Sequence, residues 1–229
     1  MELPREIEKE FYLYNGTICS VREFDPAKAT LYPSVYEVIR VIDGVPLFWE
    51  AHLDRMDQSI ALTGSAVQCR REELHHRMQQ LIRDNRVRQH NLKIIINNFQ
   101  AGHLPDEYLF FVTSRYPTAS QLEQGVPVVI HSAERKNPQA KIIAPDFRAP
   151  ILEAIQKTGA YEALLINDRN EVTEGSRSNF FVIRDGVFYT PPTERVLAGI
   201  TRQVVLTLLN RLGYHLEETI ITREFLPEA

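Results

Sequence analysis

The sequence predicts an α+β fold, because short strands, two helices and further strands follow one another in its first half. Asn15-Gly16 and Asp43-Gly44 each separate two strand-like runs, and such dipeptides favour tight β-hairpin turns. Residues 51–62 and 72–86 place apolar side chains at helical spacing. Strands that precede and follow a pair of helices, without strict strand–helix alternation, indicate the α+β class.

The elements of the first half follow from these patterns in chain order. The expected hairpins are residues 12–18 and 35–50, the helices are 51–62 and 72–86, and two later strands are 92–97 and 107–114. Together they predict an N-terminal α+β domain over residues 1–116. A polar stretch with turn formers and no long apolar run follows at 117–125, and we expect it to be a linker.

A second domain is expected over residues 126–229. Its predicted strands are 126–131, 161–168, 179–183, 187–190 and 215–221, and its predicted helices are 146–158, 200–213 and a last one from Thr222. Asp185-Gly186 predicts a hairpin turn, and Pro191 and Pro192 end the strand that follows it. Gly213 is expected to cap the C-terminus of its helix, and Thr222 the N-terminus of the last one.

The composition argues against several classes of function. The net charge is −4 and no strongly basic patch is visible, so nucleic acid is not an expected partner. No apolar run approaches the ~18 residues of a membrane helix, and the start MELPREIEKEF lacks the apolar core of a signal peptide. Cys19 and Cys69 are far apart and outside any CxxC pair, which favours a reducing cytoplasm. The seven histidines show no metal-ligand spacing, so we expect no metal site.

Three features stand out as candidate binding groups, and each has an ordinary structural alternative. Glu174 lies in the polar stretch TEGSRSN, and its residue type alone favours an acid that caps a turn over a binding group. Residues 199–201 begin a helix, where free N–H groups and the helix dipole attract anions, although in isolation the pattern favours an ordinary helix start with a threonine nearby. Arg55 lies on a helix beside Asp54, so it is a solvated or locally paired charge, or else a phosphate ligand.

The motifs VYEVIRV, HLDRMDQS, TEGSRSN and LAGITR occur in this order along nearly the whole chain. Together they resemble the class IV (fold type IV) pyridoxal-phosphate aminotransferases, a group that includes branched-chain and D-amino-acid aminotransferases and aminodeoxychorismate lyase. The pair TEGSRSN and LAGITR is more specific than either motif alone. The resemblance implies an N-terminal α/β sandwich and a C-terminal barrel-like α+β domain, with pyridoxal 5′-phosphate between them. It also implies amino acid and 2-oxo acid substrates and a homodimer.

The resemblance implies a role for individual residues of this chain. Lys141, whose spacing to Tyr161 matches the family, would bind the cofactor covalently and move a proton in catalysis. Glu174 would face the pyridine nitrogen and keep it protonated. Tyr36 and Asn98 would face the substrate. The other implied cofactor contacts are Arg55, Ser176, Asn179, Leu197, Gly199, Ile200, Thr201 and Thr222.

Further details of the polar stretch are expected from the same resemblance. Ser176, Ser178 and Asn179 are expected to orient Glu174 and the cofactor ring by hydrogen bonds. Gly175 is expected to let the backbone pass close to the cofactor ring, and Leu197 is expected to pack under the face of that ring.

Three departures from the family pattern affect the expected activity. The residues after Lys141 are Ile-Ile-Ala-Pro-Asp-Phe, whereas family members usually have an asparagine and an aromatic residue there. Asn97-Asn98-Phe99 occupies the place where the D-alanine type carries an arginine for the substrate carboxylate, although Tyr36 matches that type. The family also continues past the position of Ala229, so part of the site is expected to be missing from this sequence.

The leading hypothesis is an aminotransferase that acts on branched-chain or D-amino acids. The first alternative is an aminodeoxychorismate lyase, but those enzymes have a threonine where this chain has Val38, and valine donates no hydrogen bond. The second alternative is a protein that keeps the fold but serves as a binding or regulatory module. The unusual segment after Lys141 motivates it.

Overall fold

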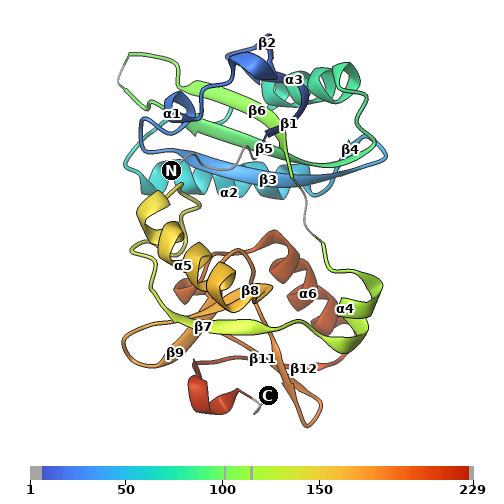
Figure 1. Cartoon of the computed structure of the whole chain (residues 1–229), viewed down its shortest axis with the longest axis vertical. Coiled ribbons are helices and arrows are strands. Elements are labelled where there is room, and N and C mark those ends of the chain that lie inside the picture. Colours follow the sequence, from blue (N-terminus) through green and yellow to red (C-terminus); the bar gives the residue numbers. More distant parts are fainter. Residues whose placement is uncertain (1–6, 101, 114–115, 227–229) are drawn as a thin grey trace. The chain divides into compact units, whose positions relative to one another are not determined.

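The computed structural model describes residues 7–100, 102–113 and 116–226, and the chain divides into two compact units (Figure 1). Unit 1 comprises Met1–Tyr116 and Ala140–Ile143, and unit 2 comprises Pro117–Gln139 and Ala144–Ala229. The first division falls after residue 116, where the sequence also places the end of a domain. The segment Ala140–Ile143 groups with unit 1, although the sequence places it within the predicted second domain.

Unit 1 is built on a six-stranded sheet with the order β2-β1-β6-β5-β3-β4, in which every neighbouring pair is antiparallel. Its strands are β1 (Ile7–Tyr14), β2 (Thr17–Ser20), β3 (Val35–Ile42), β4 (Val45–Pro46), β5 (Gln89–Asn97) and β6 (Asp106–Val112). Both predicted hairpins are confirmed. Asn15, Gly16, Asp43 and Gly44 all have positive φ, as tight hairpin turns require.

Helices α2 (Trp49–Leu62) and α3 (Arg71–Asp84) supply the core that covers one face of this sheet (Figure 1). These bounds confirm the predicted helices 51–62 and 72–86. The buried side chains of α2 and α3 pack against alternate residues of the strands, and this core includes Leu53, Met56, Ile60, Leu74, Met78, Leu81, Ile39, Val41, Leu92, Ile94, Leu109 and Phe111. The short elements η1 (Val21–Glu23) and α1 (Pro26–Ala29) lie between β2 and β3 and were not expected from the sequence.

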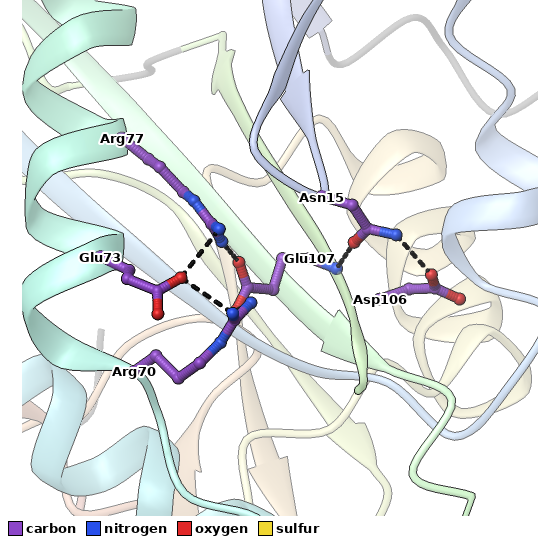
Figure 2. Close-up of polar contacts among 6 residues, drawn as sticks. All are labelled: Asn15, Arg70, Glu73, Arg77, Asp106 and Glu107. Carbon is purple, nitrogen blue, oxygen red and sulfur yellow. Dashed lines mark hydrogen bonds and ion pairs between the residues drawn. The ribbon is translucent and has the colours of Figure 1, made fainter. Parts of the chain in front are cut away.

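A network of charged side chains joins α3 to the sheet (Figure 2). The buried carboxylate of Glu107 accepts a hydrogen bond of 2.9 Å from Arg70 and a second, short one from Arg77. Glu73, which is half-exposed, contacts the same two arginines at 2.8 and 2.9 Å. The β1–β2 turn joins the network because Asn15 Oδ1 accepts the Glu107 N–H at 2.8 Å. Two arginines thus neutralise a carboxylate that would otherwise be buried alone.

Unit 2 contains a four-stranded sheet with the order β13-β9-β8-β7. Its strands are β7 (Val128–Ser132), β8 (Glu162–Ile166), β9 (Glu171–Gly175) and β13 (Ile221–Thr222). β7 and β8 are parallel, and the chain between them includes helix α5 (Pro145–Thr158). Ile151 of α5 packs on Ala163 and Leu165 of β8. The predicted helix that ends before Gly159 is therefore confirmed.

A second, three-stranded sheet in unit 2 has the order β10-β11-β12. Its strands are β10 (Val182–Arg184), β11 (Val187–Thr190) and β12 (His215–Glu218). The predicted Asp185-Gly186 turn is confirmed and both residues have positive φ. Helix α6 (Ile200–Arg211) connects β11 to the parallel β12, and Gly213 follows it in the left-handed conformation.

The last third of the chain differs from the predicted elements in several places. The run 215–221 was expected to be one strand, but β12 pairs with β11 and β13 pairs with β9 of the other sheet. The polar stretch TEGSRSN begins within strand β9, and residues 179–181 of the predicted strand 179–183 form no strand. The predicted final helix is only the three-residue 3-10 helix η3 (Arg223–Phe225), and its remaining residues 227–229 lie outside the described residues.

Two further helical elements were not part of the predictions. The expected linker contains helix α4 (Ala119–Gln124), whose N-terminus has a capping box formed by Thr118 and Gln121. The 3-10 helix η2 (Thr193–Arg195) lies between β11 and α6. None of the helices that the structure describes is long and apolar enough to span a bilayer. The described residues also contain no cluster of three or more His, Cys, Asp or Glu side chains suited to a metal ion.

Candidate active site

Lys141 belongs to a short segment that pairs with the beginning of β3. Its N–H donates to Ser59 Oγ at 3.1 Å, and its carbonyl accepts the Tyr36 N–H at 3.0 Å. Ile142 forms an isolated antiparallel bridge with Val35. These main-chain contacts fix the position of Lys141 within unit 1, so it is not a lysine on an unsupported loop.

The side chain of Lys141 lies against an aromatic ring. Its Nζ is 4.7 Å from the centroid of the Tyr36 ring, within the range of a cation–π contact. The structure therefore brings together Tyr36 and Lys141, two of the residues that the sequence predicted.

Arg55 of α2 is held by a carboxylate that the sequence analysis missed. Glu37 is fully buried, and Arg55 donates to its two oxygens from Nε at 2.7 Å and from Nη2 at 2.6 Å. His52 Nδ1 lies 2.7 Å from Glu37 Oε2. Burial alone would raise the pKa of Glu37. Hydrogen bonds from His52 and Arg55, with the charges of Arg55 and Lys141, instead hold that pKa below its ordinary value.

A signal for Glu37 was present in the strand pattern. Successive side chains of a strand alternate between its faces, so Val35, Glu37, Ile39 and Val41 share one face of β3. A carboxylate among three apolar residues on the core face requires a cationic partner.

Asn98 follows β5 in a left-handed conformation and is hydrogen-bonded within unit 1. Its φ is 59°, and its side-chain nitrogen donates to Asp106 Oδ2 at 2.9 Å. The side-chain oxygens of Asn97 and Asn98 are buried and have no hydrogen-bond partner among the described residues. In this structure Asn98 therefore anchors the β5–β6 connection.

Glu174 at the end of β9 is the centre of the candidate site in unit 2. It is 4% exposed, and Arg135 Nε lies 2.5 Å from its Oε1. The Leu197 N–H approaches its Oε2 at 3.4 Å. Arg135 also donates to the Ser176 carbonyl at 3.2 Å and stacks on Phe147 with its Cζ 5.0 Å from the ring centroid. Arg135 was not predicted, because it is 39 residues away from Glu174 in sequence.

Asn179 connects this stretch to the start of α6. Its Nδ2 donates to the Leu197 carbonyl at 3.0 Å. A Cβ atom on Gly199 would lie 1.9 Å from Asn179 Oδ1, so packing requires glycine there, whereas its φ of −62° does not. Gly199 is the N-cap and offers no side-chain cap, and the first N–H groups of a helix have no acceptor within it. The main-chain donors of Ile200 and Thr201 therefore suit an anion.

The two serines of TEGSRSN bind a different carboxylate from the one expected. Ser178 donates to Glu162 Oε2 at 2.9 Å, and Ser176 makes a short hydrogen bond to Glu162 Oε1. The expectation that these hydroxyls orient Glu174 is therefore wrong. A Cβ atom on Gly175 would lie 2.1 Å from Ser178 Oγ, so the space beside this glycine is occupied by that hydroxyl.

Thr222 lies beside β9, because it is paired with Glu171 across the β13–β9 ladder. It is the N-cap of η3, and its side chain makes no capping bond to that helix. It shares the sheet of Glu174 but makes no contact with it that would establish a common site.

A cavity of about 410 Å³ opens beside Glu174 within unit 2. Most of its lining is charged or polar, and the residues are Glu134, Arg135, Lys136, Pro138, Asn167, Arg169, Thr173, Glu174, Glu194 and Arg195. This volume is in the range of small-molecule sites. The cavity includes the Arg135–Glu174 pair but not the start of α6.

Comparisons with known proteins agree over most of the chain. Residues 34–229 match the family model described as amino-transferase class IV. D-alanine aminotransferase of Bacillus licheniformis is 30% identical over 205 residues, which cover 85% of this chain and 72% of that protein. Branched-chain-amino-acid aminotransferase of Pseudomonas aeruginosa is 28% identical over 208 residues, 83% of this chain and 68% of that protein.

A comparison with solved structures gives the same fold. The branched-chain amino acid aminotransferase of Escherichia coli has a TM-score of 0.81 and 25% identity, and the match covers 95% of this chain and 79% of that one. A second branched-chain amino acid aminotransferase, solved with pyridoxamine 5′-phosphate, has a TM-score of 0.83 and 23% identity over the same shares of the two chains. The fold type predicted from the sequence is thereby confirmed.

Proposed function

Because the chain belongs to the class IV aminotransferase family, we propose that it is a pyridoxal 5′-phosphate-dependent enzyme that moves an amino group from an amino acid to a 2-oxo acid. The family match over residues 34–229 carries this proposal. The similar curated proteins are named for D-alanine and for branched-chain amino acids, so donors of these two types are the first to test. A homodimer is the proposed assembly, as the family resemblance implies.

Residues of unit 2 are chemically suited to the two ends of the cofactor. Glu174 is a nearly buried carboxylate, and an anion favours the protonated form of a pyridine nitrogen. The uncapped start of α6 offers the Ile200 and Thr201 N–H groups to a phosphate. Asn179 Oδ1 occupies the space of a Cβ atom at Gly199, so this position has no side chain that could cover the turn. Leu197, whose N–H approaches Glu174, would pack under the ring.

Unit 1 would supply a covalent and a cationic contact. Lys141 would bind the cofactor's aldehyde carbon through Nζ. Arg55 would bind the phosphate, and Glu37 fixes the plane of its guanidinium through two hydrogen bonds. Thr222 and Ser176 remain proposed contacts of lesser weight, since Ser176 already donates to Glu162.

The cofactor supplies an aldehyde that condenses with amines and a ring that accepts the electrons left when a proton leaves Cα. Lys141 Nζ, freed when the amine of the substrate takes its place, would move the proton from the donor's Cα to the cofactor carbon that binds the amine, and would move it in the reverse direction to the acceptor's Cα. Glu174 would stay beside the ring nitrogen throughout. The Arg135 contact holds that carboxylate in place.

Glu174→Gln is expected to lower kcat about 100-fold, because an amide cannot stabilise a protonated ring nitrogen as a carboxylate does. Cofactor retention should change much less, because the phosphate donors and Lys141 are untouched. Stopped-flow absorbance after mixing cofactor-loaded enzyme with the amino donor alone measures the rate of the first half of the reaction directly. Glu134→Gln, which removes a carboxylate from the same cavity, is the matched control. Unchanged turnover in Glu174→Gln would return Glu174 to the role of a structural partner for Arg135.

The proposed function is tested with purified protein and added cofactor. Leucine, valine and D-alanine are offered as donors with 2-oxoglutarate or pyruvate as acceptor, and both products are measured. Amino transfer with at least one pair is expected. Release of pyruvate from aminodeoxychorismate without amino transfer would replace the proposal with lyase chemistry. Bound cofactor with no turnover would support a binding or regulatory protein instead.

A further inference from the structure

The proposed mechanism leaves one buried carboxylate of unit 2 unused. Glu162 begins β8 and is 8% exposed, and its Oε1 accepts the Ala163 N–H at 2.8 Å and the Ser176 N–H at 3.2 Å. The Ser176 hydroxyl makes a short hydrogen bond to the same oxygen, and the Ser178 hydroxyl donates to Oε2 at 2.9 Å. Arg177 Nε lies 3.7 Å from Oε2, and its side chain is 40% exposed. Hydrogen bonds more than a close ion pair therefore compensate for the burial of this carboxylate.

Most of these donors belong to residues 175–178, the loop that lies between Glu174 and Asn179. The loop is also closed by a main-chain hydrogen bond of 2.7 Å between its first N–H and its last carbonyl. Both residues that flank the loop are proposed cofactor contacts, and both contact the main chain of Leu197. Glu162 therefore holds the segment whose shape determines where Glu174 and Asn179 lie.

The carboxylate of Glu162 lies directly against the main chain next to Glu174. A Cβ atom on Gly175 would lie 3.3 Å from Glu162 Cδ and 2.1 Å from Ser178 Oγ, so no side chain separates Glu162 from the residue that follows Glu174. Stabilisation of the β8–β9 pair is one explanation of this cluster. Its place between two proposed cofactor contacts points to a second one, because a shift of the loop would move Glu174.

We propose that Glu162 is a positioning residue, which acts through residues 175–178 to hold Glu174 against the ring nitrogen of the cofactor and Asn179 against the start of α6. The proposal rests on the proposed function, because that function gives Glu174 and Asn179 their roles. Glu162 itself would touch neither substrate nor cofactor. A misplacement of about 1 Å in a site can cost about 100-fold in rate, so a loosened loop should slow the reaction without weakening donor binding.

A double-mutant cycle tests whether Glu162 acts through Glu174. Glu162→Gln replaces charge-assisted hydrogen bonds with weaker ones, and it should lower kcat about 10-fold while KM for the amino donor stays within about twofold of the wild type. Glu174→Gln alone is expected to lower kcat about 100-fold. In that background Glu162→Gln should cost less than about twofold more, because two changes that act through one carboxylate are not additive.

Glu153→Gln, which changes an exposed carboxylate on α5 of the same unit, is the matched control and should behave as the wild type. A tenfold loss of kcat from Glu162→Gln in both backgrounds would overturn the proposed action through Glu174.

A binding measurement monitors the loop without turnover. Calorimetry on the full chain, prepared without cofactor, uses pyridoxamine 5′-phosphate as the ligand. Glu162→Gln and Ser178→Ala should each weaken its Kd about 5- to 10-fold, the effect of losing about one hydrogen bond. Ser178→Ala removes a single hydroxyl from the Glu162 carboxylate, so it keeps the test valid if Glu162→Gln does not fold.

The two measurements separate this inference from the proposed function. If the wild type transfers amino groups but both variants keep its kcat and its Kd, Glu162 only stabilises the β8–β9 pair, and the proposed function stands. If the wild type transfers none, the proposed function fails. Binding of pyridoxamine 5′-phosphate that is absent, or equal in the wild type and both variants, then overturns the inference as well.

Discussion

Replacing Lys141 with alanine is expected to reduce amino transfer at least about 1,000-fold, because positioned proton transfer alone contributes about 10²- to 10⁴-fold. The covalent attachment of the cofactor is lost as well. The fold should survive, since the contacts of Lys141 with Ser59 and Tyr36 use its main-chain N–H and carbonyl, which alanine also has. Steady-state rates measure the first effect. Borohydride reduction followed by peptide mapping should place the cofactor on Lys141 in the wild type.

Two further variants make this result specific. Lys141→Arg keeps a positive charge over Tyr36 but cannot form the covalent bond, so it should be as inactive as Lys141→Ala. Lys157→Ala removes an exposed lysine from α5 and should match the wild type. Turnover of Lys141→Ala within tenfold of the wild type, or attachment of the cofactor to Lys136 or Lys157, would show that another lysine does the chemistry.

Glu37→Gln is expected to lower the free energy of unfolding of unit 1 by about 3–5 kcal/mol, the usual cost of removing one partner of a buried ion pair. The side chain of Arg55 is only 7% exposed and would keep its charge without the carboxylate. Trp49, the single tryptophan of the chain, lies buried on α2 and reports the unfolding of this unit by fluorescence in urea. Glu50→Gln on the same helix is the control. That side chain is 78% exposed, so a change within about 0.5 kcal/mol is expected.

The effect of Glu37→Gln should depend on pH. The pKa of Glu37 is lowered in the folded protein, so its stabilising contribution is fully present above its ordinary value of 4.5. The contribution disappears as the pH falls through the lower, folded-state pKa. Wild type and Glu37→Gln should therefore differ most near pH 7 and converge in acid. A difference that is small at pH 7, or independent of pH, would mean that the ion pair does not stabilise the unit.

Local patterns predicted those elements whose determinants are close in sequence. Asn15-Gly16, Asp43-Gly44 and Asp185-Gly186 each form their hairpin turn because both residues of each pair adopt positive φ. The helices α2 and α3 followed from apolar spacing in the same way. In these cases the residues that determine the turn or the helix are neighbours in the sequence.

Local sequence patterns did not predict which strands pair when those strands are far apart in the sequence. The run 215–221 was predicted as one strand, but its first half pairs with Val187–Thr190 and its last residue with Val172. The choice between the two sheets depends on partners that are tens of residues away.

The candidate site shows the same division. The family resemblance assigned Glu174 and Asn179 to the same cofactor site. In the structure both residues contact the main chain of Leu197. The partners of the carboxylates were missed, because Arg135–Glu174 and Ser178–Glu162 join separate segments. Glu162 had one detectable signal, since it is a carboxylate at the start of the apolar strand EALLI.

The short segment that contains Lys141 makes the chain cross between the two units three times, after Tyr116, Gln139 and Ile143. The units are therefore not interchangeable modules joined by one tether. A fragment that ends at residue 116 would leave the start of β3 without the strand segment that pairs with Val35 and Tyr36. A protease cut within Pro117–Gln139 would still leave unit 2 covalently joined, through Ile143, to one segment of unit 1. Chimeras of this family should accordingly exchange Ala140–Ile143 together with the N-terminal unit, even though it is encoded inside the C-terminal one.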